Sequence, residues 1–226
     1  ILGNGEKILA TAAPAGPAFE AASIKCGVRA ASGAIETVKV VEGKLEIGTI
    51  DGAPAIGICG SGLVDAVACL VQLGILDSSG KFTETDDPNL LERDGEKIYM
   101  LTDDVFLSQR DVRELQFAKA AIATGWALLA EEFGIQDTDI QQVLLAGSFG
   151  SYLSPASAVK IGLVPKISVL RIVSAGNVAG EGAKMALLST QERHGATTLL
   201  DEIEYVELSD REDFNDKFVE RLAFPV

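Results

Sequence analysis

Three short glycine-containing stretches could place the backbone directly against a ligand. They are residues 15–20 (AGPAFE), 59–62 (CGSG) and 146–150 (AGSFG). Glycine lets the backbone approach a ligand without a Cβ in the way. A helix N-terminus adds unpaired N–H groups and a partial positive charge, which suit phosphate. Most such stretches, taken alone, are only tight turns, so each by itself is a weak signal for a ligand site.

Other catalytic patterns are missing from the sequence. It has no GxxxxGK[ST] phosphate loop, and Gly60-Ser61-Gly62 lacks the third glycine of a dinucleotide-binding GxGxxG motif. It also has no GxSxG nucleophile elbow. The single histidine, His194, lies in a polar stretch, and we expect it to be solvated. We therefore name no catalytic residue and no metal ligand.

The glycine stretches sit among predicted strands. Asn4-Gly5 and Glu42-Gly43 each separate two apolar runs, which predicts two β-hairpins. The polar residues 77–95 are expected to form a loop. Further strands are predicted at 55–59, 142–146, 167–173 and 203–208.

The clearest helical pattern ends at Gly134. Ser108 is its predicted N-cap, and Asp111 three residues later resembles a capping box. Shorter helices are predicted at 18–25, 63–72, 155–161 and 178–188, and a last helix is predicted after Ser209. Hairpins followed by helices alternating with apolar strands predict an α/β fold, with a mixed sheet and flanking helices.

Composition limits the class of protein. The 226 residues carry 19 basic and 33 acidic side chains, a net charge of −14. Such a chain should repel nucleic acids and anionic membranes, although solubility alone also explains the charge. No apolar run is long enough to span a membrane. Three cysteines favour reduced thiols over a disulfide framework, so we expect a cytoplasmic protein.

Two stretches resemble the actin, sugar-kinase and DnaK-type ATPase superfamily. Residues 143–150 (VLLAGSFG) are similar to its adenosine motif, in which a strand and a turn of small residues pack on adenine and ribose. Residues 174–184 (SAGNVAGEGAK) are similar to its "connect 2" helix. The resemblance implies an actin-like, ribonuclease H-like ATPase lobe.

One subfamily matches more closely, the C-terminal ATPase domain of reductive activators of corrinoid-dependent proteins. The stretches that carry this resemblance span almost the whole chain: AGPAFE (15–20), ICGSGLVD (58–65), QRDVRELQ (109–116), residues 144–152, 176–182 and 218–225. It implies that ATP, with magnesium in the complete protein, drives the reduction of Co(II) corrinoid to Co(I). The implied partner is a corrinoid protein or a corrinoid-dependent methyltransferase.

The resemblance also implies parts that this sequence does not contain. Complete members carry a ferredoxin-like [2Fe–2S] domain and the first half of the ATPase, with an aspartate-containing phosphate loop. This chain opens on the apolar pattern Ile1-Leu2-Gly3, so we expect residues 1–226 to be a C-terminal lobe, truncated at its N-terminus and part of a longer protein. The missing N-terminal half is then an expected partner, and this piece alone is expected to be inactive. A homodimer is left open.

The same resemblance ranks the candidate nucleotide-binding residues. Gly147, Ser148, Phe149 and Gly150 come first, then Gly16 and Glu20, and then Gly60, Ser61 and Gly62, which could be only a structural turn. Lys25 and Arg29 could reach phosphate or ribose, or remain on a solvated surface. Two alternatives stay open for the whole chain: a non-catalytic docking module for a corrinoid protein, or part of a sugar or acyl kinase of the same superfamily.

Overall fold

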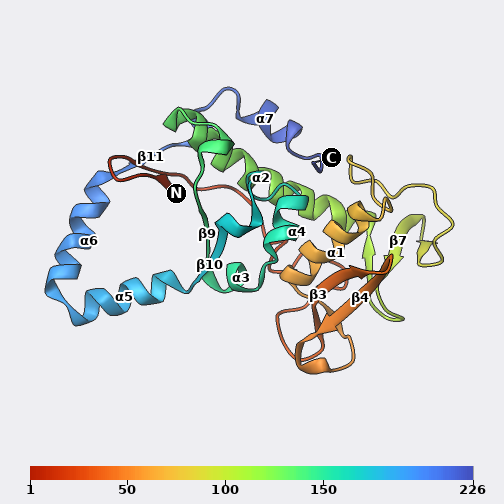
Figure 1. The fold of residues 1–226 in the computed structure, drawn as a ribbon. Coiled ribbons are helices and arrows are strands. Elements are labelled where there is room, and N and C mark those ends of the chain that lie inside the picture. The colour runs from red at the N-terminus through yellow and green to blue at the C-terminus, as the bar shows by residue number, and fades with distance from the viewer. Residues whose placement is uncertain (226) are drawn as a thin grey trace.

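The computed structural model describes residues 1–225, and its strands form four small sheets rather than one broad sheet (Figure 1). Two sheets are mixed, one is antiparallel and one is a parallel pair. The predicted α/β class with mixed strands is confirmed, in divided form. The sheets are β1 (Leu2–Gly3), β2 (Ile8–Ala10) and β11 (Ile203–Tyr205); β3 (Ala34–Val41), β4 (Lys44–Thr49) and β5 (Gly57–Ile58); β6 (Leu90–Arg93), β7 (Glu96–Met100) and β8 (Phe106–Ser108); and β9 (Val143–Ala146) with β10 (Ile172–Gly176).

The helices differ greatly in length and in burial. The longest lies diagonally across the molecule in Figure 1 and packs against the C-terminal helix. The α-helices are α1 (Gly60–Gln72), α2 (Gln109–Phe133), α3 (Gly147–Tyr152), α4 (Pro155–Lys160), α5 (Val178–Leu188), α6 (Thr190–Glu202) and α7 (Phe214–Glu220). Short 3₁₀ turns lie at Ile50–Gly52, Asp137–Asp139, Val169–Arg171 and Leu208–Asp210.

Both predicted hairpins form, with different turns. Glu42 and Gly43 have φ values of 49° and 77°, as a two-residue turn between β3 and β4 requires. Between β1 and β2 the turn is longer: the side-chain oxygen of Asn4 accepts the backbone N–H groups of Glu6 and Lys7, at 2.8 and 2.9 Å. An asparagine side chain has thus replaced part of the backbone pairing expected of a tight turn.

The predicted helix at 18–25 is wrong, because these residues form a series of turns. Ala21 has a φ of 58°, in the left-handed region, which interrupts any helix. Gly27 explains why the chain accepts this conformation. A Cβ at Gly27 would lie 2.0 Å from the carbonyl oxygen of Ala21, so the backbone folds back on itself at a place that only glycine allows.

The capping box predicted for the long helix is confirmed. The Ser108 hydroxyl accepts the N–H of Asp111, and the Asp111 carboxylate accepts the N–H of Ser108. At the other end, Gly134 has a φ of 78° and closes the helix as a left-handed C-cap. These two signals are local in sequence, which is why they could be read without the fold.

Several other strand and helix boundaries differ from those predicted from the sequence. The predicted loop at 77–95 includes β6, and the strand predicted at 167–173 begins only at Ile172. The last helix begins after Asp213, whose side chain makes no capping hydrogen bond, and the predicted cap Ser209 lies in a 3₁₀ turn. Helix α6 was not predicted, and it contains the exposed His194.

The apolar core lies between α1, α2 and the sheet of β3, β4 and β5. Eleven of the 13 residues of α1 are buried, and α1 packs against β3 and α4. Helices α5 and α6 instead extend away from this core at the left of Figure 1, between β10 and β11. No residue of either helix is buried.

Within the described residues, no helix is both long enough and apolar enough to cross a lipid bilayer. Cys26, Cys59 and Cys69 are all free thiols. Burial and the nearby Asp65 carboxylate raise the pKa of the Cys69 thiol to about 11, so this cysteine is a poor nucleophile at neutral pH.

Candidate functional site

The three glycine stretches meet around one hollow of about 830 Å³. Each contributes to its wall, although they lie far apart in the sequence. The lining residues from the three stretches are Ala15, Gly16, Phe19 and Glu20; Cys59, Gly60 and Ser61; and Ser148 and Phe149, with Tyr152 at the end of α3. The arrangement expected from the sequence, an open hollow between residues 16–20 and 147–150, is therefore present.

Gly60 is the point at which the three stretches touch. A Cβ on Gly60 would lie 2.0 Å from the carbonyl oxygen of Phe19 and 3.1 Å from a ring carbon of Phe149. The rings of Phe19 and Phe149 themselves are 5.0 Å apart between centroids and tilted by 34°. Only glycine permits this approach, so Gly60 allows one turn and one helix to close on the N-terminus of α1.

Six of the nine predicted site residues line the hollow, and three do not. Gly62 packs behind it, where a Cβ would lie 2.1 Å from the carbonyl oxygen of Ile35. Gly150 is buried against the backbone of Leu145, at 2.9 Å from an added Cβ. Gly147 has a φ of 85° and begins α3. These three glycines shape the turns, and the residues beside them, Ser61, Ser148 and Phe149, line the hollow.

A second wall was anticipated from the sequence only at Arg29, which had been left open as a residue that could reach phosphate or ribose. This wall consists of Val28, Arg29, Ala30, Glu36 and Ile50. Of the two cations left open, Arg29 lines the hollow, whereas Lys25 binds Glu96 at 2.5 Å. The sequence held no clear signal for Glu36, because the pairing of β3 with β4 shifts register between Ile35 and Thr37 and simple strand alternation fails there.

The polar groups of the hollow are of two kinds. Some hold the backbone together: Ser61 donates to the carbonyl oxygen of Glu36 at 3.0 Å, and the Cys59 thiol donates to that of Ile35 at 3.3 Å. Glu20, Arg29 and Glu36 also line the hollow, and their side chains form no hydrogen bond or ion pair within residues 1–225. This set can bind a ligand that has hydroxyl groups, an anionic group and a flat apolar part.

No metal-binding cluster accompanies the hollow. Across residues 1–225 no group of three or more His, Cys, Asp or Glu side chains is placed to hold a metal ion.

Comparison with known proteins assigns the chain to a family. A family model described as the C-terminal domain of RACo, the ASKHA domain, matches residues 1–226. The chain belongs to this family. The fold and the resemblance predicted from the sequence are thereby confirmed.

The relatives of this chain are named as activators or reductases of corrinoids or corrinoid proteins. The corrinoid activation enzyme RamQ of Eubacterium limosum is 36% identical over 84% of this chain and 35% of its own length. The [Co(II) methylated amine-specific corrinoid protein] reductase of Methanosarcina barkeri is 25% identical over 97% and 43%, respectively. A solved structure, a reductive activator for corrinoid, iron–sulfur protein, superposes with a TM-score of 0.90 at 35% identity and covers 99% of this chain and 37% of that one. The chain thus spans less than half the length of each.

Proposed function

We propose that this domain supplies the nucleoside-binding wall of an ATP-dependent reductive activator of corrinoid proteins. The observation that supports this most directly is the meeting of three glycine turns, distant in sequence, around one hollow. Membership of the RACo C-terminal family and relatives named as corrinoid activators and reductases support the rest. These names favour an activator over the sugar or acyl kinase that the sequence had left open.

The hollow has the size and lining of a nucleoside site. Its volume of about 830 Å³ falls in the range of roughly 300–1,000 Å³ usual for small-molecule pockets. The ring pair of Phe19 and Phe149 offers an apolar surface to a planar base. The carboxylates of Glu20 and Glu36 can accept hydrogen bonds from ribose hydroxyls.

The phosphates would extend past the N-terminus of α1. Cys59, Gly60 and Ser61 line the hollow where this 13-residue helix begins. Helix N-terminal N–H groups favour anions, and the guanidinium of Arg29 adds a positive charge beside the same hollow. We assign no residue of this chain to phosphate cleavage or to metal binding.

In the whole protein, the proposed activity couples two reactions. One electron passes from an iron–sulfur centre to Co(II) of the corrinoid, which becomes Co(I). ATP is hydrolysed to ADP and phosphate, and its free energy drives the uphill transfer. The role of this domain is to bind the nucleoside and to change its contacts when the nucleotide changes, and the iron–sulfur centre is assigned to another part of the polypeptide.

We also propose that the rest of the ATPase in the same polypeptide covers the arm formed by α5 and α6 and the sheet of β9 and β10. The exposed fractions of Leu187 and Leu188 are 76% and 85%, and that of Leu144 in β9 is 60%. Parallel sheets normally have both faces covered by their own chain. The relatives have more than half of their length outside the matched region, which is ample to provide such a cover.

Paired substitutions on α3 test the nucleoside site in the full-length protein. Ser148 and Ser151 are both exposed on α3, but only Ser148 lines the hollow. Ser148→Leu should weaken binding of ATP with magnesium at least about tenfold, about 1.4 kcal/mol, by filling ligand space. Ser151→Leu should leave it within about twofold, because its side chain lies elsewhere on the same helix. Isothermal titration calorimetry measures both.

The outcomes separate the proposed function from the docking module. Absence of ATP binding by the full-length protein, or an equal loss in the two variants, would contradict a nucleoside site in this hollow. A corrinoid protein that is captured equally well with and without ATP would then support a docking module without nucleotide control. Capture that depends on ATP, and is lost in Ser148→Leu, supports the activator.

A further inference from the structure

Residues 109–116, which carry part of the family resemblance, do not line the hollow, yet one of them is tied to its wall. Asp111 is fully buried at the start of α2. One of its carboxylate oxygens accepts the N–H of Ser108 at 2.8 Å, as a capping box requires. The other accepts the N–H of Lys25, 86 residues away in sequence, at 2.9 Å. The second bond has no part in capping the helix.

Lys25 lies in the middle of a segment that forms two parts of the hollow. Residues 15–20 line it before Lys25, and residues 28–30 line it after. The segment is built of turns rather than a helix, so regular backbone pairing does not hold it. Bonds between Ile58 of β5 and its neighbours Cys26 and Val28 secure only the end that follows Lys25.

A second carboxylate holds Lys25 from the solvent side. Glu96 at the start of β7 binds the Lys25 ammonium at 2.5 Å and accepts the backbone N–H of Arg110 at 2.8 Å. The pKa of Glu96 is lowered, chiefly by its hydrogen bond with Lys25, so the pair stays charged at neutral pH. Lys25 is thus held by its backbone and by its side chain, and both ties lead to the start of α2.

We propose that Asp111, together with Glu96, positions the 15–25 wall of the hollow and so sets nucleotide affinity from outside the site. The inference rests on the proposed function for its effect on ATP, but its structural half does not. Hydrogen bonds to a buried carboxylate are stronger than neutral ones, and a buried N–H that loses its acceptor is costly. Loss of either accepting oxygen of Asp111 should therefore loosen the turn segment around Lys25, although Ala21 and Ile24 still pack in the core.

The competing explanation is that Asp111 only caps α2. Ser108→Ala separates the two, because it removes the hydroxyl that accepts the Asp111 N–H and leaves both carboxylate oxygens in place. Lys25→Ala is a second control: it removes the exposed ion pair with Glu96 and leaves the N–H bonded to Asp111. Asp111→Asn replaces one accepting oxygen with an amide donor, so one of the two N–H groups must lose its partner.

The test measures amide hydrogen exchange and ATP affinity in the full-length protein. Without nucleotide, Asp111→Asn should speed exchange at residues 16–25 about tenfold or more, and Ser108→Ala should leave it within about twofold, with Lys25→Ala between them. ATP binding with magnesium should weaken about tenfold in Asp111→Asn, about 1.4 kcal/mol, and within about twofold in Ser108→Ala.

Each outcome decides the inference. Unchanged exchange at 16–25 in Asp111→Asn overturns it, and so does an equal effect of Ser108→Ala, which would leave only a helix cap. If the wild-type protein binds no ATP, the proposed function fails, while the exchange data still decide the positioning role. If Asp111→Asn does not fold, Glu96→Gln takes its place from the exposed side, and no rise in exchange there contradicts the inference.

Discussion

Helices α1 and α5 have similar lengths and are both rich in small and apolar residues, but they lie in opposite environments. In α1, 11 of 13 residues are buried, and in α5 none of 11 is. The long helix α2 resembles α1, with 15 buried residues out of 25, and α6 resembles α5. The chain thus contains a closed core region, α1 and α2 with the sheet of β3 to β5, and an open arm, α5 and α6.

The difference shows that an apolar helix does not carry the identity of its partner in its own sequence. Isolated helices of 11 or 13 residues are marginal in water, and within the described residues α5 and α6 contact mainly each other and β11 and bury no residue fully. The three glycine turns differ from these two helices, because they find their packing partners within the chain. Residues 59–62 are fixed by α1, which they begin, and the segment that follows residues 15–20 is bonded to Asp111 of α2. The core region therefore holds two of the three turns that line the hollow.

The largest expected contrast comes from removing one leucine in each region. Leu70 of α1 is fully buried, and Leu188 at the end of α5 is 85% exposed. Leu70→Ala should lower the free energy of unfolding of this chain by about 3–4 kcal/mol, because it leaves a cavity. Leu188→Ala should change it by less than about 0.5 kcal/mol. Urea unfolding followed by circular dichroism measures both.

The same pair in the full-length protein sharpens the contrast. If the rest of the ATPase covers the arm, Leu188→Ala should then cost about 1–2 kcal/mol or more, since the side chain becomes buried. Leu70→Ala should cost the same in both contexts. A Leu188→Ala effect that stays near zero in the full-length protein would show that this part of the arm remains uncovered.

A buried lysine makes the core region less stable than its packing suggests. Lys119 of α2 is 1% exposed, donates to the carbonyl oxygen of Ala223 and lies 5.2 Å from the centre of the Phe224 ring. Burial, with a smaller effect of Arg221, lowers its pKa to about 8. Lys119→Met should stabilise the chain at pH 7 by about 1–2 kcal/mol, because it removes the cost of the buried charge and loses one hydrogen bond.

The pH dependence gives this prediction its sign. The Lys119 pKa is lower in the folded state than the ordinary 10.5, so the folded chain binds fewer protons between about pH 8 and 10.5. The wild-type contribution to stability is therefore reduced below pH 8 and recovers as the pH rises toward 10.5. Lys119→Met should flatten this rise in urea unfolding at pH 7, 8.5 and 10. A steeper rise in the variant would contradict it.

Asp65 of α1 is a smaller polar cost in the same core. One of its oxygens accepts the N–H of Val38 at 3.3 Å, and the other has no hydrogen-bond partner among residues 1–225. Burial raises its pKa, so its contribution to stability is full at low pH and is lost as the pH rises through the folded-state pKa. Asp65→Asn should stabilise the chain by about 1 kcal/mol or less at pH 7 and weaken the pH dependence above pH 4.

Calorimetric melting temperatures at pH 4.5 and 7.5 check the Asp65 prediction. The wild-type melting temperature should fall between these two values by more than that of Asp65→Asn. Asp111→Asn is unsuitable as a comparison, because that carboxylate has a partner for each oxygen. Destabilisation by Asp65→Asn at pH 7.5 would contradict the prediction, because it would mean that the ionised carboxylate stabilises the folded chain more than a neutral amide does.

What the sequence could predict was mostly local. The two ends of α2 are predicted by residues within one turn of them, namely Ser108, Asp111 and Gly134. The turn between β3 and β4 is likewise predicted by Glu42-Gly43. The glycine stretches could be recognised as ligand-facing candidates for the same reason. Five of the six candidate residues that line the hollow lie at or next to one of these glycines, and the sixth, Glu20, follows Gly16 by four residues.

What the sequence could not predict depends on contacts between distant segments. The turns at 16–25 look helical in composition, but the left-handed Ala21 is set by close packing with Gly27. Glu36 reaches the hollow only because the mixed sheet brings β3 and the turn segment together. The second oxygen of Asp111 is the clearest case, because a capping box gives no sign of a bond to a residue 86 positions away.

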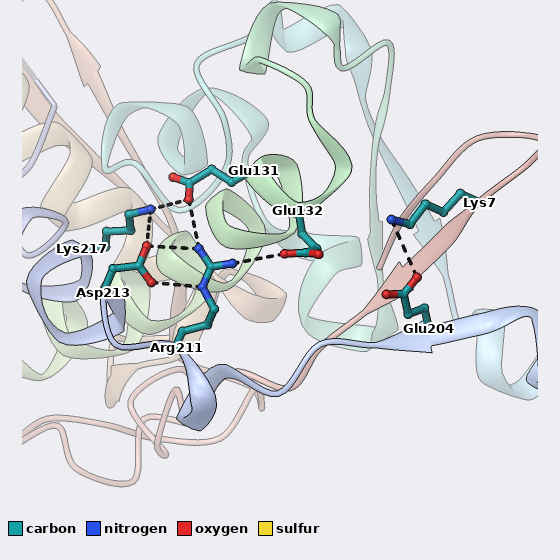
Figure 2. Close-up of polar contacts among 7 residues, drawn as sticks. All are labelled: Lys7, Glu131, Glu132, Glu204, Arg211, Asp213 and Lys217. Carbon is teal, nitrogen blue, oxygen red and sulfur yellow. Dashed lines mark hydrogen bonds and ion pairs between the residues drawn. The ribbon is translucent and has the colours of Figure 1, made fainter.

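Surface ion pairs give the smallest expected effects, and they again distinguish the core region from the arm. Figure 2 shows Arg211 between Glu131, Glu132 and Asp213, with Lys217 bound to Glu131 and Asp213. This network joins the chain before α7 to the end of α2. The second pair in the figure, Lys7 with Glu204 at 3.7 Å, joins the first hairpin to β11 beside the arm.

Arg211→Ala should lower the free energy of unfolding by less than about 1 kcal/mol, and Lys7→Ala by less than about 0.5 kcal/mol. The difference is expected because Arg211 holds Asp213 through two bonds of 3.1 Å, whereas the Lys7 pair is single, longer and more exposed. Urea unfolding in 0.05 M and 1 M NaCl should show the Arg211 effect shrinking with salt. An Arg211 effect that does not respond to salt would mean that the arginine stabilises α7 through packing of its side-chain methylenes on the end of α2.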